Sequence, residues 1–353
     1  MRWKNLVDEN NKLTFEGGGR QNVELLRFIG MLLIMGHHLY HIGFVGSYIC
    51  RNCWVWVDFY FILTGIFTYK HFSSIQDREN PGSEALIYTI HKFKRFFGYT
   101  VIAVLLQYII DNVDYLFTGD IHSFIRSFIY APYEILYLSS SGICSARVAP
   151  IWYLSAMLIV FPMMVYLMQK VPEFWKVFAF TFPILYFGHK GVNTDRAWPN
   201  DMARALACMA LGTLAYLCAE FLAKQNVEKK IRKIILSGIE ICSALFAIYV
   251  SVLNKDYINI MELLFFIICV LMISGVTYSS CIKGEVFKFL GKLSMPMFIF
   301  HWGIGSLANI LTDNLKQRFL FYYIGTLLVA MLALGITRFL KQNEFRTGKK
   351  RTA

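Results

Sequence analysis

The chain has 353 residues, of which 56% are hydrophobic, 16% aromatic and only 16% charged, and its mean hydropathy is +0.48. Soluble domains are about half apolar and about a quarter charged, so this composition excludes an ordinary soluble domain and indicates an integral membrane protein. The net charge of +12 alone would suit a nucleic-acid partner. The basic residues, however, lie in the gaps between apolar stretches, as the positive-inside rule describes, and we predict no nucleic-acid partner.

The apolar residues form about ten stretches, each long enough to cross about 30 Å of hydrocarbon as a helix. They lie near 23–42, 53–70, 95–111, 151–169, 174–188, 202–223, 233–253, 259–278, 287–309 and 319–341. The sequence therefore predicts an all-α, polytopic transmembrane helix bundle. Residues 121–138 are amphipathic and contain Pro132, which favours an interfacial or re-entrant segment, with an eleventh span as the alternative.

The distribution of basic residues predicts the orientation of the chain. With the N-terminus inside the cell, about 25 of the 35 lysines and arginines fall on the cytoplasmic side, which also places the C-terminus inside. We accordingly divide the chain into a cytoplasmic N-terminal segment (1–22), a transmembrane domain (23–341) and a basic cytoplasmic tail (342–353).

The first span carries the most ionisable side chains, which are costly in a bilayer unless they are paired or face a cavity. Arg27 and His38 are eleven residues apart and return to within about 20° of one helix face, about 16 Å apart along the axis. Glu24 can pair with Arg27 at a spacing of three residues, and His41 is close in phase to His38. His37 points about 100° away and is predicted to pack. The alternative for an intramembrane histidine is an interhelical hydrogen bond.

Four further places carry polar groups in or beside spans. Asp58 in the second span is interpreted as a hydrogen-bonding link to another helix. Lys92, Lys94 and Arg95 end the next cytoplasmic loop, where they form either a phosphate cradle or an ordinary positive-inside flank. Arg204 opens the sixth span on the outer side, as an acceptor contact or as a residue that snorkels to the interface. His301 lies in the ninth span, after Ser294 and Pro296.

Several segments together resemble the acyltransferase 3 family of membrane acyl-CoA-dependent O-acyltransferases. Glu24-Leu-Leu-Arg27 followed by His38 resembles the family's Arg-x10-His first helix. Val57 to Gly65 resembles its Phe-Phe-x-x-Ser-Gly element, with Thr64 in place of Ser. The other matching segments are Lys92-Phe-Lys-Arg95, similar to a basic Arg-x-Arg-type motif, Ile151-Trp152-Tyr153-Leu154, similar to a Trp-x-Leu element, and Gly291 to Trp302, similar to a Gly-x-x-Ser…Leu-x-x-x-His segment. The resemblance covers about residues 20 to 340.

The resemblance implies transfer of an acyl group, most often acetyl, from cytosolic acyl-CoA to a hydroxyl of a glycan or glycolipid at a bacterial-type plasma membrane. On this hypothesis His38 is the general base and Arg27 holds the donor or stabilises developing negative charge, while the basic residues of 92–95 bind the CoA phosphates and no metal takes part. The candidate lining residues are Glu24, His41, Asp58, Trp152, Tyr153, Arg204 and His301. External residues that could meet a polyol acceptor are Asp195, Trp198, Asp201 and Arg204.

Two other classes of function remain open at the level of sequence. A transporter or flippase for a glycolipid or an organic anion also needs buried Arg, His and Asp side chains, although the chain shows neither a repeat nor paired broken helices. A structural membrane scaffold has no need of an Arg and a His on one buried face. The sequence does not predict the oligomeric state.

Overall fold

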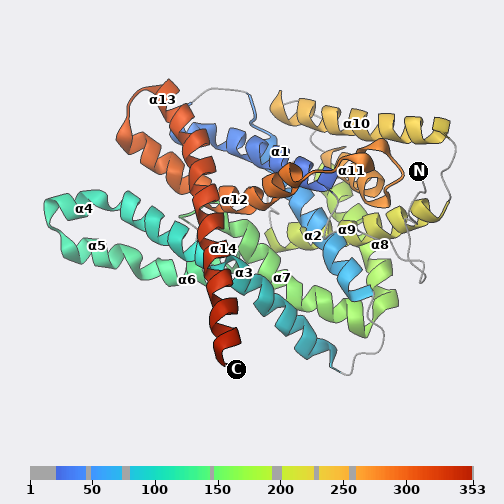
Figure 1. The fold of residues 1–353 in the computed structure, drawn as a ribbon, viewed down its shortest axis with the longest axis horizontal. Helices are drawn as coiled ribbons and strands as arrows, with labels where there is room; N and C mark the ends of the chain where they lie inside the picture. Colours follow the sequence, from blue (N-terminus) through green and yellow to red (C-terminus); the bar gives the residue numbers. More distant parts are fainter. Residues whose placement is uncertain are drawn as a thin grey trace.

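The computed structural model describes residues 21–44, 49–73, 80–143, 147–192, 201–225, 230–253 and 260–351 (Figure 1). Within these ranges every regular element is a helix, and no strand is present. The all-α architecture predicted from the sequence is therefore confirmed.

Ten segments within the described ranges form the main helices. They are α1 (Gln21–His37) with its 3-10 continuation η2 (His38–Ile42), α2 (Trp56–Ser73), α3 (Pro81–Asp111), α7 (Ile151–Lys170), α8 (Pro172–Val192), α9 (Asp201–Lys224), α10 (Lys230–Val252), α11 (Met261–Ser274), α12 (Glu285–Leu311), and α14 (Thr326–Arg351), which follows α13 (Leu315–Leu320) and the π-helical turn η8 (Phe321–Gly325). The shorter elements are η3 (Cys53–Val55), α4 (Val113–Thr118), α5 (Ile121–Ser127), η4 (Phe128–Tyr130), α6 (Ala131–Ile135), η5 (Ser139–Ser141) and η7 (Tyr278–Cys281).

Each predicted span coincides with one of these helical segments, but not all of them are built to cross a bilayer alone. Among the described residues, six helices are long and apolar enough, namely 21–42, 81–111, 151–170, 201–224, 230–252 and 315–340. The segments α2, α8, α11 and α12 do not meet that standard, and α11 has only 14 residues. The chain is an integral membrane protein by this criterion, and a count of ten spans is not confirmed.

The stretch 121–138 is not an eleventh span. It contains α5, the 3-10 turn η4 and α6, and none of these approaches the roughly 20 residues that a spanning helix needs. Ile121 and Ile125 are 58% and 66% exposed, as expected for an apolar surface outside the packed interior. Figure 1 shows α4 and α5 projecting together at one edge of the molecule.

The interior is organised around α9 and α12. Helix α9 packs most extensively on α2 and also contacts α7, α8 and α11, whereas α12 packs against α1, α3 and α14 (Figure 1). At the crossing of α2 and α9, a Cβ on Gly65 would overlap the backbone carbonyl of Met209, and one on Gly212 would overlap that of Ile62. Small residues at such a crossing let two helix backbones approach closely, which fixes the position of α9 and its polar side chains.

We expect Gly212→Val to lower the thermal unfolding temperature of the protein in detergent. The added methyl groups force the two backbones apart, and overpacking of this kind costs about 1–3 kcal/mol. The matched control is Gly238→Val in α10, where no atom lies within 4 Å of the added Cβ. The unfolding temperature is measured by tryptophan fluorescence. Equal unfolding temperatures of the two variants would contradict the close crossing of α2 and α9.

Candidate functional site

A cavity of about 510 Å³ lies where the end of the first helix meets α2, α7, α9 and α12. This volume falls in the range of sites that enclose a small molecule, about 300–1,000 Å³. Its lining residues are Ile34, His37, His38, Trp54, Val57, Ser139, Ala149, Pro150, Trp152, Asp201, Arg204 and Phe298. The cavity thus contains four of the candidate site residues from the sequence, His38, Trp152, Asp201 and Arg204.

His38 stands where α1 changes its geometry. The α-helix ends at His37, the chain tightens into the 3-10 turn His38–Ile42, and Gly43 closes it at a φ of 92°. Atom Nδ1 of His38 is buried without a hydrogen-bond partner. The prediction that His37 packs away from the site is wrong, because the cavity wraps around the end of α1 and both histidines line it. The Nδ1 of His37 donates a hydrogen bond to the carbonyl oxygen of Arg51 at 2.7 Å.

His301 and Trp302 of α12 bring two aromatic rings against His38. The ring centroids of His38 and His301 are 5.2 Å apart, and Trp302 meets His38 edge-on at 5.3 Å. His301 is fully buried, and its Nδ1 donates to the carbonyl oxygen of Phe298 at 2.8 Å. Helix α12 therefore supplies the residues that pack behind His38.

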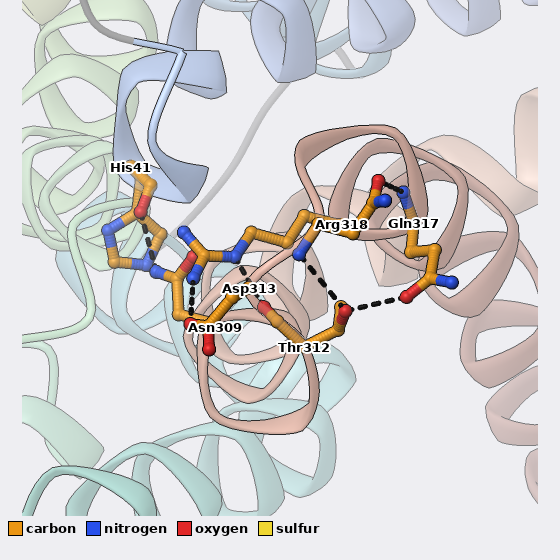
Figure 2. Close-up of polar contacts among 7 residues, drawn as sticks. His41, Asn309, Thr312, Asp313, Gln317 and Arg318 are labelled. Atoms are coloured by element: carbon orange, nitrogen blue, oxygen red, sulfur yellow. Dashed lines mark hydrogen bonds and ion pairs between the residues drawn. The ribbon is translucent and has the colours of Figure 1, made fainter.

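His41 supports this wall and does not line the cavity. Its ring stacks on Trp302 at 3.9 Å, and its Nε2 contacts the Ser306 hydroxyl at 3.0 Å. Ser306 in turn accepts a hydrogen bond from Gln107 of α3 at 2.9 Å. Figure 2 shows that Asn309 also donates to the carbonyl oxygen of His41, at 2.7 Å. These contacts fix the end of the first helix on α12.

The turn after α12 completes the same support. Arg318 of α13 donates to the carbonyl oxygen of Thr312 at 2.6 Å and pairs with Asp313 at 3.2 Å (Figure 2). A Cβ on Gly43 would come within 3.0 Å of the Arg318 guanidinium. The left-handed glycine that ends the 3-10 turn is thus also a point of close approach between the first helix and α13.

Arg204 and Asp58 form a buried ion pair between α9 and α2. The guanidinium donates to both oxygens of the Asp58 carboxylate, at 2.6 and 3.0 Å, and Asp58 is fully buried. The guanidinium also lies 4.5 Å from the ring centroid of Trp54 and 5.3 Å from that of Trp152. Asp58 has the helix partner that the sequence predicted, whereas Arg204 does not snorkel to an interface. Arg204 therefore forms a structural ion pair with Asp58 and also lines the cavity.

A short loop closes the cavity between α6 and α7. Tyr137 has a φ of 57°, its hydroxyl lies 2.6 Å from that of Thr100, and its carbonyl oxygen accepts from Ser155 at 2.6 Å. Burial raises the pKa of the Tyr137 phenol, which therefore stays neutral. Ser140 reaches Asp201 at 3.3 Å. Asp201 is thereby held at the cavity, while Asp195 and Trp198 lie outside the described residues.

Arg27 lies away from the cavity, at the other end of α1. It pairs with Glu24 at 2.8 Å, as the spacing predicts, and its carbonyl oxygen accepts from the Tyr60 hydroxyl. A Cβ on Gly291 would overlap the Glu24 carboxylate, so α12 passes directly beside this ion pair.

The positive charges of Arg27, Lys92 and Arg95 lie close enough to repel one another, and we call these three residues the basic cluster. The sequence predicted that Lys92 and Arg95 end a loop. Both instead lie on α3, which begins at Pro81. Lys94 is exposed and, at about 200° from Lys92, occupies another face of that helix. The structure thus brings two of the three predicted cations to Arg27.

An aromatic layer separates the basic cluster from the cavity. Phe298 lines the cavity, Tyr153 packs against Phe298 with ring centroids 5.3 Å apart, and Tyr60 lies 6.5 Å from Tyr153. Tyr60 contacts Arg27 in turn. Tyr153 is therefore placed between the two groups of polar residues and does not line the cavity.

Within the described ranges, no group of three or more His, Cys, Asp or Glu side chains is arranged to hold a metal ion. The chain matches the model of the acyltransferase 3 family, described as an acyltransferase domain, over residues 20–337. No curated protein and no solved structure matches it. The matched region includes the cavity, the aromatic layer and the basic cluster.

Proposed function

Because the chain belongs to the acyltransferase 3 family, we propose that it is a membrane O-acyltransferase that moves an acyl group, which we take to be acetyl from the family resemblance, from acyl-CoA to a hydroxyl of a glycan or glycolipid. The observation that carries the proposal is the arrangement along the first helix. The basic cluster lies at one end, and His38 lies in the cavity at the other. Such an arrangement suits a donor with an anionic head and a reactive far end. The proposed setting is a bacterial plasma membrane with both chain ends in the cytoplasm.

The basic cluster supports the assignment of the donor. CoA carries phosphate groups, which Lys and Arg bind through charge-assisted hydrogen bonds. Arg27, Lys92 and Arg95 bring three positive charges together with one carboxylate, Glu24, which pairs with Arg27. The remaining excess of positive charge favours an anion that binds among them. Because Arg27 does not line the cavity, we assign it to holding the donor and not to stabilising the oxyanion at His38.

The cavity supports the assignment of the acceptor. Trp54 and Trp152 line the cavity with aromatic surface against which a sugar ring can pack beside the Arg204 guanidinium, and Asp201 and Ser139 offer hydrogen-bonding groups. In the proposed reaction His38 takes the proton of the acceptor hydroxyl, whose oxygen attacks the thioester carbonyl carbon. The tetrahedral intermediate collapses with cleavage of the carbon–sulfur bond, and the proton passes from His38 to the CoA thiolate. The products are an ester and free CoA.

The pantetheine arm of the donor has to pass the aromatic layer of Tyr60, Tyr153 and Phe298. In the structure these rings pack one against the next between the basic cluster and the cavity. The proposal therefore includes a shift of this layer when the donor binds, with the thioester then reaching His38.

Lys92→Ala and Arg95→Ala are expected to raise the KM for acetyl-CoA, each by about 10- to 100-fold, because a hydrogen bond to a charged group is worth about 1.5–3 kcal/mol. The value of kcat changes less, since neither side chain lies at His38. The measurement is release of CoA thiol by purified protein at varied acetyl-CoA concentration. Lys94→Ala is the matched control, with an unchanged KM. If all three variants keep the KM of the wild type, the donor binds elsewhere.

A further inference from the structure

Two buried imidazole nitrogens without partners lie on neighbouring rings. They are Nδ1 of His38 and Nε2 of His301, and the two ring centroids are 5.2 Å apart with the planes tilted by 34°. A buried polar atom without a hydrogen bond destabilises the fold, and folded proteins retain few of them. Here two such nitrogens lie on adjacent histidines beside the cavity, so one contact between the two rings could explain both.

The tautomer of His301 follows from its other nitrogen. The carbonyl oxygen of Phe298 can only accept a hydrogen bond, so Nδ1 of His301 carries the hydrogen. In the neutral ring Nε2 is then an acceptor with a free lone pair, and the full burial of His301 keeps it from bulk water. This nitrogen needs a donor from within the protein.

His38 is the neighbouring histidine that has a nitrogen to offer. The Nδ1 of His37 already bonds to the carbonyl oxygen of Arg51, and the Nε2 of His41 already contacts Ser306. A centroid separation of 5.2 Å between two imidazoles is compatible with an N–H···N hydrogen bond of about 2.9 Å. The bond from Nδ1 of His301 to the Phe298 carbonyl oxygen holds the His301 ring, so the His38 ring is the one that turns.

We propose that His301 is a positioning residue whose Nε2 accepts a hydrogen bond from Nδ1–H of His38. This bond leaves the lone pair of His38 on Nε2, the nitrogen available to the cavity, where the acceptor hydroxyl binds. It then stabilises the imidazolium that forms when His38 takes the proton, as a carboxylate does in catalytic triads. His301 exchanges no proton itself. The inference rests on the proposed function, in which His38 is the base.

The kinetic test compares His301→Phe, which keeps an aromatic ring without an acceptor, with His301→Gln, whose amide oxygen restores one. We expect His301→Phe to lower kcat for acetyl transfer about 10- to 100-fold with the KM for acetyl-CoA unchanged, and His301→Gln to recover most of that loss. Melting temperatures show whether each variant is folded. If both variants lose the same activity in proportion to a loss of stability, His301 has only a packing role and the inference fails.

A second readout does not depend on turnover. In wild-type protein labelled with 15N-histidine, His38 is expected to show a protonated Nδ1 and an unprotonated Nε2, and in His301→Gln the same tautomer is expected to persist. Protonation of His38 at Nε2 in the wild type overturns the inference. The variant His38→Ala distinguishes a failure of this inference from a failure of the proposed function. An inactive His38→Ala beside a fully active His301→Phe removes this inference alone, whereas an active His38→Ala removes the proposed base as well.

Discussion

Replacement of His38 by alanine is expected to lower kcat for acyl transfer by about 10²–10⁴-fold, the usual contribution of a general base. The imidazole lies in the cavity with Nδ1 directed into the protein, and it is the base to which we assign the acceptor proton. Donor binding should persist, because the basic cluster lies at the other end of α1. The measurement is acetyl transfer by purified variant and wild type, together with acetyl-CoA binding by calorimetry.

The matched control for this substitution is His122→Ala. His122 lies on α5 and is exposed, so its loss should leave both kcat and binding unchanged. An equal fall in activity for both variants would point to a general effect of the purification. Full activity of His38→Ala would remove His38 from the chemistry.

Breaking the Asp58–Arg204 pair is expected to have the largest effect on stability. Asp58→Ala leaves the guanidinium of Arg204 buried, with its side chain only 13% exposed, and without its carboxylate. Removal of one partner of a buried pair typically costs about 3–5 kcal/mol, because the remaining charge is uncompensated. We expect a clear fall in the thermal unfolding temperature, measured in detergent by tryptophan fluorescence.

The double variant Asp58→Leu with Arg204→Met tests the reason for that loss. Replacing both charges by apolar groups of similar volume removes the uncompensated charge, so most of the lost stability should return. Its activity should stay low, because Arg204 is part of the cavity wall. Glu285→Ala, which breaks an ion pair with Lys288 whose carboxylate side chain is 84% exposed, is the control. If Asp58→Ala melts no lower than Glu285→Ala, the pair contributes nothing to stability.

The helices themselves could be predicted from the sequence, because a long apolar stretch has few other stable forms in a bilayer. The residues at which the helices begin and end could not be predicted in this way. Helix α3 begins at Pro81, well before the predicted start at 95, since the basic residues 92–95 separate its short apolar run 85–90 from the longer apolar stretch that follows. Proline at the first position of a helix was the local signal for that start. Helix α11 stops at Ser274 because Gly275 adopts a left-handed φ of 76°.

Contacts between residues of one helix could be predicted from the sequence, whereas contacts between different helices could not. The spacing of Glu24 and Arg27 predicted their ion pair correctly, since helix geometry fixes it. The pairing of Asp58 with Arg204 depends on how α2 crosses α9. The sequence nevertheless held a signal, because a lone acid and a lone base in separate apolar stretches each need a partner. The approach of His301 to His38 likewise required the packing of α12 on α1.

The roles of these residues remain proposals that one measurement tests most directly. Purified protein in lipid nanodiscs is incubated with acetyl-CoA labelled in its acetyl group and with a glycolipid acceptor, beside His38→Ala. The account predicts that label enters an ester of the acceptor with equal release of CoA thiol in the wild type, and that His38→Ala binds acetyl-CoA without transferring the label. Movement of the glycolipid across the membrane with no cleavage of the thioester, or transfer at the wild-type rate by His38→Ala, would contradict it.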